Sequence, residues 1–280
     1  MESIYRLRIA ELDVQITSPA RLQLPKYFLP FLADDTQNPA QIAIEVFSGT
    51  DGICWEDRQI SHNVFLTGNG IVQRYLWNDG QYFVRLEPAD RKGSCRLGVP
   101  ESFFETFCES GNWLSVLAIE RLLIPYGRVI LHASAVVWND RAILFTAPSG
   151  GGKSTQAALW ADCGAEVLNG DKVVLMQDKG IWYACGSPVA GSSCIYKNLQ
   201  VPVAAVFLVQ KHPENAVTRQ SKRNAFLFFY QNAVKSAWDE KFNHSLIDVL
   251  ECAAAQIPVY ELCCTPDARA VQCVMNCLEW

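Results

Sequence analysis

The residues with the clearest capacity for chemistry form one short run near the middle of the chain. Residues 147–155 read Ala-Pro-Ser-Gly-Gly-Gly-Lys-Ser-Thr, which matches the pattern G-x-x-x-x-G-K-[ST] except at its first position, where Ala147 replaces glycine. Glycines reach positive φ, so consecutive N–H groups can turn inward at a helix start and hold an anion. Three glycines, a Lys-Ser pair and a strand-to-helix context coincide, which favours a phosphate-binding loop over a glycine-rich turn with an incidental lysine.

Each residue of this loop has an expected task if the anion is a nucleoside triphosphate. Lys153 would reach the β- and γ-phosphates as a point charge, and the Ser154 hydroxyl would complete a Mg²⁺ shell of water and phosphate oxygens. Thr155 would sit near the α-phosphate. The expected nucleotide-binding residues are Ser149, Gly150, Gly151, Gly152, Lys153, Ser154 and Thr155. The loop does not by itself decide what is done with the γ-phosphate.

A carboxylate at a suitable distance along the chain would add catalysis to binding. P-loop ATPases commonly end a second hydrophobic strand with an aspartate, but the buried run over 203–209 leads into Gln210, Lys211 and His212. The nearest substitute is Asp171, which comes 18 residues after Lys153 at the end of a short strand. An acid so placed can reach the metal or the hydroxyl that attacks the γ-phosphate. The alternative is an ordinary turn aspartate that follows a glycine.

The second half of the chain alternates strands and helices around this loop. Apolar runs, turn residues and helix formers predict the elements from their periodicity and boundaries. The expected elements are strands over 129–138 and 141–146 joined at Asn139-Asp140, a helix over 154–163 ended by Gly164, short strands over 166–169, 173–177 and 182–185, a buried strand over 203–209, helices over 223–235 and 242–255, a strand over 259–263 and a final helix over 266–278.

The first half predicts a different architecture. Residues 4–16 alternate apolar and polar with a phase slip near Ala10-Glu11, which indicates a bulged strand or two short strands. Another strand is expected over 42–47, and a hairpin over 71–87 turns at Asn78-Asp79-Gly80. Residues 112–124 are apolar at helical spacing. We therefore expect an antiparallel β-rich domain over 1–110, a linking helix over 111–127 and a P-loop domain over 128–280. The P-loop domain is expected to have an α/β fold, and the chain as a whole an α+β fold.

Composition excludes several other classes of protein. The 280 residues are 50% hydrophobic with a formal charge of −5, and residues 1–125 hold 11 Lys+Arg against 16 Asp+Glu. No basic face suited to nucleic acid is evident, and no apolar run is long enough to span a membrane. None of the eleven cysteines stands in a Cys-x-x-Cys pair. Reduced thiols, no structural zinc site and a cytoplasmic location are expected.

Several of these segments resemble a known kinase family. The run Leu131-His132-Ala133-Ser134-Ala135-Val136, residues 145–155 and residues 168–171 are similar to the C-terminal domain of HPr kinase/phosphorylase, whose fold is shared with ATP-dependent PEP carboxykinases. Gly170 takes the first position of that family's acidic pair, and Asp171 takes the second. The resemblance continues through Gly-Ser-Pro-Val-Ala-Gly-Ser at 186–192 and covers about residues 128–280.

The resemblance implies an ATP- and Mg²⁺-dependent kinase that phosphorylates a serine of a protein or a ribosomally made peptide. It implies catalytic roles for Asp171, Lys153 and His132, and metal contacts for Ser154 and Asp171. His132 also fits an ordinary core histidine on an apolar strand. The glycine-rich segment that HPr kinases use for dephosphorylation is not recognisable, so a kinase rather than a phosphorylase is expected.

Other functions remain open at this point. The same fold supports a kinase that phosphorylates the hydroxyl of a free metabolite such as an amino acid. The missing acid is also compatible with a catalytically inactive nucleotide-binding protein that escorts a partner. Ser187 and Ser192 could line an acceptor groove, and the aromatic run over 226–230 could stack on a base or belong to the core. Assembly of several copies of the chain also stays open.

Overall fold

The computed structural model describes residues 2–37, 39–47, 57–68, 70–77, 80–88, 93–109, 117–148, 150–188 and 194–280. The chain forms two compact units. The N-terminal unit comprises Met1–Tyr126 together with Ser236–Asn243, and the C-terminal unit comprises Gly127–Lys235 together with His244–Trp280. None of the helices in the described ranges has the length and apolar character needed to cross a membrane.

The N-terminal unit is built on one sheet. Its described strands follow the order β1-β2-β3-β8-β7-β6-β5-β4. Its elements are β1 (Ser3–Ile9), β2 (Leu12–Ser18), the 3₁₀ helix η1 (Lys26–Phe31), β3 (Ala40–Phe47), β4 (Arg58–Ser61), β5 (Val64–Thr67), β6 (Gly70–Trp77), β7 (Gly80–Pro88), β8 (Cys95–Pro100), α1 (Glu101–Glu109), α3 (Ile119–Leu123) and the 3₁₀ helix η2 (Ile124–Tyr126).

The phase slip near the N-terminus is a tight turn between two strands. β1 and β2 pair antiparallel with Ile9 opposite Leu12, and both turn residues have positive φ, 48° at Ala10 and 59° at Glu11. Two positive-φ residues match the right-handed twist of a two-residue hairpin. The two-strand interpretation is therefore confirmed. The hairpin of β6 and β7 is confirmed as well, although its expected turn residues 78–79 lie outside the described residues.

The expectation of an antiparallel sheet is wrong for two of the strand pairs. β3 runs parallel to β2 on one side and parallel to β8 on the other, whereas the remaining described pairs are antiparallel. Parallel neighbours need a crossover of a dozen or more residues. Residues 19–39 provide that length before β3, and β8 joins β3 from far along the chain. The N-terminal sheet is consequently mixed.

The C-terminal unit contains the alternating strands and helices. Its elements are β9 (Val129–His132), β10 (Ser134–Trp138), β11 (Arg141–Thr146), α4 (Lys153–Asp162), β12 (Glu166–Asn169), β13 (Lys172–Asp178), β14 (Ile181–Cys185), β15 (Gln200–Lys211), β16 (Ala216–Arg219), α5 (Lys222–Asn232), α6 (Glu240–Gln256), β17 (Val259–Cys264) and α7 (Ala268–Cys277). The expected helix after the loop is confirmed, and Gly164 beyond its end has a φ of +93°.

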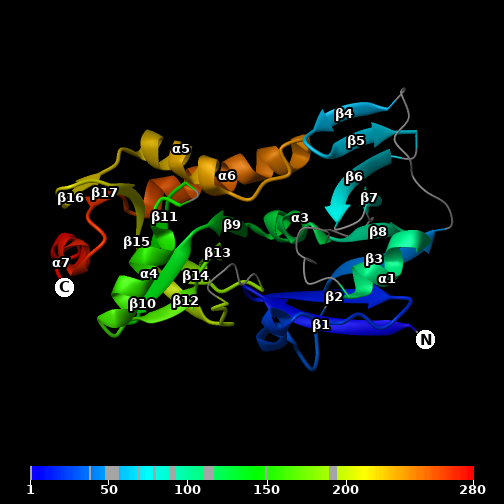
Figure 1. Ribbon diagram of the computed structural model, residues 1–280, viewed down its shortest axis with the longest axis horizontal. Coiled ribbons are helices and arrows are strands. Elements are labelled where there is room, and N and C mark those ends of the chain that lie inside the picture. The colour runs from blue at the N-terminus through cyan, green and yellow to red at the C-terminus, as the bar shows by residue number, and fades with distance from the viewer. Residues whose placement is uncertain are drawn as a thin grey trace. The chain divides into compact units, whose positions relative to one another are not determined.

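β15 organises the sheet of this unit. It pairs parallel with β11 and with β17 through its C-terminal half, and antiparallel with β14 through its first residues. The order continues from β14 to β13 and β9 on one side, and from β11 to β10 and β12 on the other (Figure 1). β11 and β15 both point their carboxyl ends toward the glycine-rich loop, which places the loop at the edge where ligands of such sheets bind.

The expected strand over 129–138 is broken into two. The Ala133 N–H donates to the Leu131 carbonyl at 3.0 Å, so the chain bends between β9 and β10. β9 then pairs with β13, while β10 pairs with β11 and β12. This break separates His132 from the hairpin that the sequence predicts and joins it to β13.

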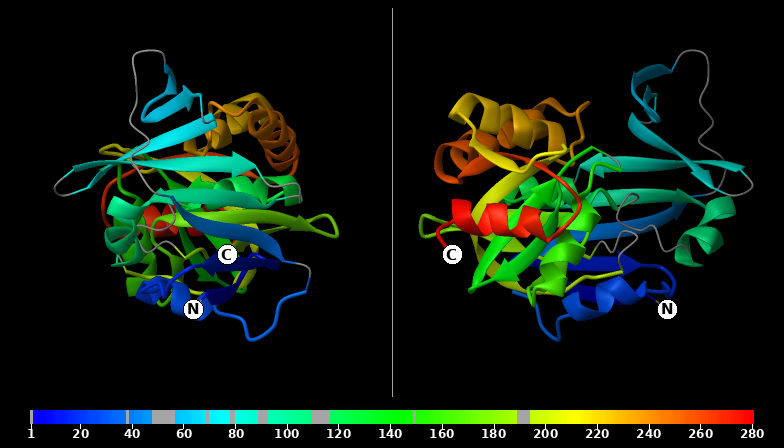
Figure 2. Two further views of the ribbon diagram at one scale, coloured as in Figure 1. Left: turned by 90° about the vertical axis from the view of Figure 1, so that its right-hand side faces the viewer. Right: turned by 60° about the vertical axis from the view of Figure 1, so that its left-hand side comes forward.

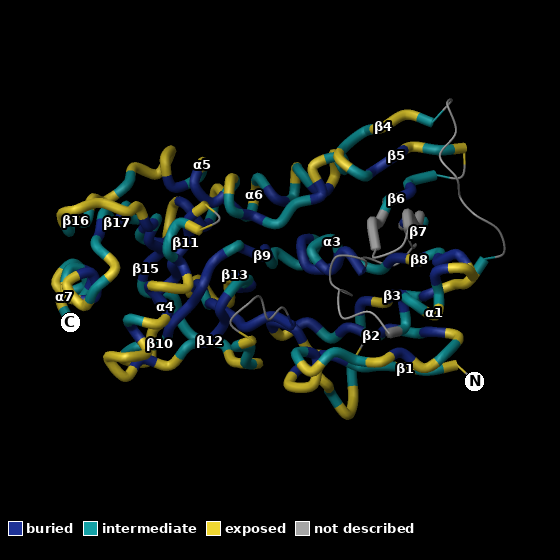
Figure 3. The backbone as a smooth tube through the Cα atoms, viewed as in Figure 1, coloured by how far each residue is buried: buried dark blue, intermediate teal, exposed yellow. Residues whose placement is uncertain are grey.

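A continuous apolar core lies between the sheet and two helices. Trp160 of α4 is fully buried, and its ring lies tilted against Phe145 of β11 and edge-on to Trp138 of β10. α7 adds Val271 and Val274 to the same core. Figure 2 shows α4 and α7 side by side, and Figure 3 shows the buried run along the central strands. The core therefore fixes the helix that follows the glycine-rich loop.

Candidate functional site

The glycines of the loop are needed for two different reasons. Gly150 and Gly152 have φ of +72° and +112°, a conformation that L side chains rarely adopt. Gly151 has ordinary φ, but a Cβ there would lie 2.7 Å from the Ala147 Cβ and 2.9 Å from the Pro148 carbonyl oxygen. Ala147 itself has no positive φ, so alanine is tolerated at the first position of the pattern.

Lys153 is folded back onto its own loop. Its Nζ donates to the Ala147 carbonyl at 2.9 Å, and the residue is only 8% exposed. Burial lowers the pKa of Lys153, and the nearby Asp171 charge opposes that shift. The buried Ser134 hydroxyl donates to the Lys153 carbonyl at 3.1 Å and so fixes the first residue of α4 to β10. The ammonium is thus held beside the loop backbone by the fold.

The start of α4 presents exposed hydroxyl groups and backbone N–H groups without helical partners. Ser154 and Thr155 are exposed on the first turn of α4. Ser149 lies outside the described residues. The Gln156 N–H donates to the Gly152 carbonyl at 2.9 Å, which is the first hydrogen bond of the helix ladder. The N–H groups before it have no helical partner, as in any helix N-terminus. This arrangement suits an anion.

Asp171 and His132 form a pair on two neighbouring strands. His132 Nε2 lies 3.0 Å from Asp171 Oδ1, with the two side chains 44% and 26% exposed. The hydrogen bond from His132 lowers the pKa of Asp171, burial opposes this, and the charges of Lys172 and Lys153 add to the lowering. An ionised carboxylate has no hydrogen to donate, so the imidazole carries the hydrogen at Nε2.

A buried asparagine positions the Asp171 backbone. Asn169 is fully buried, and its Oδ1 accepts from the N–H groups of Asp171 at 2.9 Å and Lys172 at 3.0 Å. Its Nδ2 donates to the Ser187 carbonyl at 3.1 Å, and the Ser187 hydroxyl donates to the Lys172 carbonyl at 2.6 Å. Asp171 is therefore held at the start of β13 by side chains that face away from solvent.

The Gly-Ser-Pro run at 186–188 is part of the hydrogen-bonded structure that holds Asp171 in place. A Cβ at Gly186 would lie 1.7 Å from the Lys197 carbonyl oxygen, so only glycine fits. Ser187 is 1% exposed, which makes it a structural residue rather than a lining of an acceptor groove. Gly191 and Ser192 lie outside the described residues.

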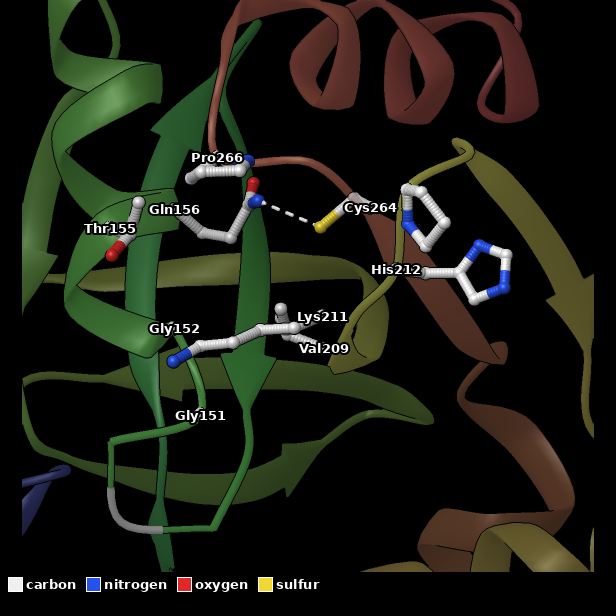
Figure 4. Close-up of a pocket in the computed structure, with 10 residues that line it drawn as sticks. Gly151, Gly152, Thr155, Gln156, Val209, Lys211, His212, Cys264 and Pro266 are labelled. Atoms are coloured by element: carbon white, nitrogen blue, oxygen red, sulfur yellow. Dashed lines mark hydrogen bonds between the residues drawn. The ribbon is translucent and has the colours of Figure 1, made fainter.

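A pocket lies directly beside the loop. It has a volume of about 350 Å³ and is lined by Gly151, Gly152, Thr155, Gln156, Val209, Lys211, His212, Pro213, Cys264 and Pro266 (Figure 4). The carboxyl ends of β15 and β17 form its far wall. A second hollow on the other side of the loop is lined in part by Gln231 and Asn232 of α5. The aromatic residues 226–230 line neither of them.

Mg²⁺ would find oxygen ligands here. The Ser154 hydroxyl is exposed, and Asp171 is an ionised carboxylate. Mg²⁺ is usually held by one or two carboxylates, with waters and substrate phosphates completing its shell. The donor set therefore fits a magnesium ion brought in with a nucleotide. Within the described ranges, no cluster of three or more His, Cys, Asp or Glu residues could hold a metal by itself.

The geometry brings together most of the residues that the sequence singles out. Lys153 and Asp171 are close enough for each charge to shift the pKa of the other, and His132 contacts Asp171. Sequence reasoning missed the supports Ser134 and Asn169, as well as Gln156. A polar residue inside an otherwise apolar strand is the only signal that could have identified Ser134, and Asn before Gly-Asp the signal for Asn169.

Comparison with known proteins adds a weak likeness. No protein-family model matches the chain, and no curated protein matches it. Among solved structures, the HPr(Ser) kinase/phosphatase from Coxiella burnetii aligns with a TM-score of 0.32 at 15% sequence identity. The alignment covers 54% of this chain and 87% of that chain. The chemistry of the site rests on the residues described above.

Proposed function

We propose that the chain transfers the γ-phosphoryl group of ATP to a hydroxyl, with a serine of a protein or peptide as the acceptor. One observation carries the proposal. An ionised carboxylate, Asp171, is paired with His132 and lies within electrostatic reach of the loop lysine, Lys153. A phosphate-binding loop alone supports binding, and the added carboxylate supports transfer.

The loop residues would hold and neutralise the triphosphate. Residues 150–152 lead directly into the N-terminus of α4, where an anion is favoured. The Lys153 side chain is buried, and this burial lowers the pKa of its ammonium. A charge in such surroundings interacts more strongly with a phosphate oxygen than a solvated one does. Exchange of the Ala147 carbonyl for a phosphate oxygen would give the ammonium a charged partner.

The pair of Asp171 and His132, here called the dyad, would take the proton of the acceptor hydroxyl. Asp171 Oδ1 accepts from His132, which leaves Oδ2 to accept from a serine hydroxyl. His132 orients the carboxylate, so the hydroxyl oxygen is aligned before the γ-phosphoryl group moves. Positioning of this kind is the main protein contribution to phosphoryl transfer. Mg²⁺ bound at Ser154 and Asp171 would supply charge neutralisation between the phosphates.

Exposure of the dyad favours a large acceptor. His132 is 44% exposed and Asp171 26% exposed at their side chains, so a residue presented on a surface or a strand can approach them. A free metabolite is better served by a pocket that buries most of its surface. This argument supports a serine within a polypeptide over a free amino acid.

The test uses ATP labelled at its γ-phosphate. The full chain is incubated with arrayed peptides that differ only in a central serine, threonine or alanine, and separately with free serine. We expect label on the serine peptides and none on the alanine peptides, and the label should fall at least a hundredfold with Asp171→Asn. Label on free serine alone would identify a metabolite kinase. Nucleotide binding without transfer to any acceptor would contradict the proposal.

A further inference from the structure

The pocket beside the loop lies where the nucleoside of a bound nucleotide would be. In a loop of this kind Lys153 faces the β- and γ-phosphates, and Thr155 faces the α-phosphate, to which the nucleoside is attached. Gly152, Thr155 and Gln156 form one wall of the pocket of about 350 Å³. That volume lies at the lower end of the ~300–1,000 Å³ typical of small-molecule sites. A nucleoside leaving the loop at Thr155 would therefore enter this pocket.

The opposite walls suit a flat aromatic ring. Pro213 and Pro266 contribute apolar surface, and Val209 adds more beside the loop, 3.4 Å from where a Cβ on Gly152 would be. Figure 4 shows the side chain of Lys211 extending back toward Gly152, on the phosphate side of the pocket. The pocket thus combines a cation near the loop with apolar side chains on its walls, as a nucleotide requires.

Gln156 places an unpartnered hydrogen-bond acceptor at this pocket. The residue is 1% exposed, and its Nε2 donates to the Cys264 Sγ at 3.3 Å. Its Oε1 is buried and has no hydrogen-bond partner among the described residues. Figure 4 shows the carboxamide at the pocket wall, with Nε2 turned toward the thiol. A buried acceptor without a donor costs free energy, which a ligand with a suitable donor would recover.

We propose that this pocket is the base site of the nucleotide and that Gln156 selects adenine. The proposal rests on the proposed function, because it assumes that the loop binds a nucleoside triphosphate. Adenine carries an amino donor at the ring position where guanine carries a carbonyl acceptor. The Gln156 Oε1 accepts from that amino group, whereas a guanine carbonyl would leave two acceptors facing each other. Gln156 is thus a specificity-determining residue.

The test compares three ligands on the wild-type chain and two variants by calorimetry. The ligands are ATP, purine riboside triphosphate, which lacks only the 6-amino group, and tripolyphosphate, which engages only the loop. The variants are Gln156→Leu and the matched control Gln272→Leu on the exposed face of α7. Wild type and control should bind ATP about tenfold tighter than purine riboside triphosphate, since one hydrogen bond to a buried group is at stake. Gln156→Leu should bind the two equally and keep its tripolyphosphate affinity.

A second measurement needs no variant at all. Photolabelling of the wild-type chain with 2-azido-ATP should attach the label within residues 209–213 or 264–266, which line the pocket. Equal wild-type affinity for ATP and purine riboside triphosphate, an ATP preference that survives Gln156→Leu, or label elsewhere in the chain would each overturn the inference while leaving a triphosphate-binding loop intact. If the wild type binds none of the three ligands, the proposed function fails and the inference fails with it.

Discussion

His132 Nε2 lies 3.0 Å from Asp171 Oδ1, although 39 residues separate the two along the chain. The contact exists because β9 pairs antiparallel with β13, with His132 opposite Lys172 in the register. Asp171 immediately precedes that strand and is held by the buried Asn169. A strand pairing and a turn therefore create a dyad that no local sequence pattern contains. Its position near Lys153 makes it the feature most worth testing.

Replacing Asp171 by asparagine should separate binding from catalysis. Asp171→Asn removes the proton acceptor but keeps the size of the side chain, so phosphoryl transfer should fall by roughly 10²–10⁴-fold. The loop backbone is untouched, so the variant should still bind ATP, and excess Mg²⁺ should restore any affinity that is lost with the Asp171 metal contact. Asp178→Asn at the exposed end of β13 is the matched control and should retain full activity. Near-normal transfer by Asp171→Asn, measured with labelled ATP, would place the chemistry on another residue.

Loss of His132 should shift the pH profile of the reaction. The His132 hydrogen bond is the largest cause of the lowered pKa of Asp171, so His132→Ala should raise that pKa and move the acid limb of kcat/KM to higher pH. His132→Gln keeps an N–H donor near the Nε2 position and should move the limb less. An unchanged acid limb of kcat/KM in His132→Ala would show that the contact with His132 does not set the pKa of Asp171.

The same pair carries a linked effect on stability. A carboxyl whose pKa is lower in the folded chain than in the unfolded chain stabilises the fold above the unfolded value of ~3.9, and that contribution is lost as the pH falls through the folded pKa. Acid unfolding of His132→Ala should therefore begin at a higher pH than that of wild type, followed by circular dichroism. Coincident acid transitions in the two proteins would contradict this expectation.

Local patterns predicted most elements, whereas contacts between distant segments were beyond them. The helix after the loop and the strands β12 to β15 follow from periodicity and from glycines at their ends, because these signals lie within the element. The break at Ala133 and the parallel neighbours of β3 depend on which strands meet, which no local pattern records. The elements η1, β4, β5, β8, α1 and β16 were not predicted.

The candidate site divides in the same way. Glycines and the Lys-Ser pair mark the loop in sequence because backbone conformation limits the residues that fit. Ser134, Asn169 and Gln156 support or border the site through contacts 18 to 108 residues away along the chain. Their types are ordinary polar residues, and only the pairing of β10, β12 and β17 with their neighbours gives them a position near the loop.

Two glycines of the loop should respond differently to substitution. A side chain at Gly150 would meet nothing within 4 Å, and asparagine tolerates its positive φ better than other residues do. Gly150→Asn should keep most of the ATP-induced rise in Tm. Gly151→Ala would bring a Cβ to 2.7 Å from that of Ala147, so the loop must move and the ATP-induced rise should be lost. Equal rises in both variants would contradict this account of the loop.

Removing the charge of Lys153 should cost binding but not folding. Its pKa is lowered mainly by burial, so the folded chain holds that proton less tightly than the unfolded chain. At neutral pH the ammonium therefore opposes folding, and this opposition is relieved as the pH rises from the folded pKa to the unfolded pKa. Unliganded Lys153→Met should melt no lower than wild type.

The same variant should lose the stabilisation that ATP provides. For wild type at ~100 times the dissociation constant this amounts to roughly 2.7 kcal/mol. Lys222→Met at the exposed start of α5 is the matched control and should respond to ATP as wild type does. A lower unliganded Tm together with an intact ATP response would assign Lys153 a structural role instead.

Arg121 should matter more to the N-terminal unit than another arginine that also has an acidic partner. Arg121 Nη2 lies 2.7 Å from Asp239 Oδ2, with side chains 19% and 20% exposed, and its guanidinium lies 4.7 Å from the centre of the Trp238 ring. Residues 236–243 join this unit from far along the chain. Arg121→Leu leaves the partly buried Asp239 carboxylate without its charged partner, so the free energy of unfolding should fall by roughly 1–3 kcal/mol.

The matched comparison is Arg96→Leu, whose partner Glu87 is 2.9 Å away at side-chain exposures of 52% and 38%. An exposed pair contributes about 0–1 kcal/mol, so this variant should lose little. Adding Asp239→Asn to Arg121→Leu should recover part of the lost unfolding free energy, because the unpaired Asp239 charge is then removed. Urea unfolding of the four chains measures all of these effects. Equal losses for Arg121→Leu and Arg96→Leu, with no recovery in the double variant, would show that residues 236–243 do not anchor the N-terminal unit through this contact.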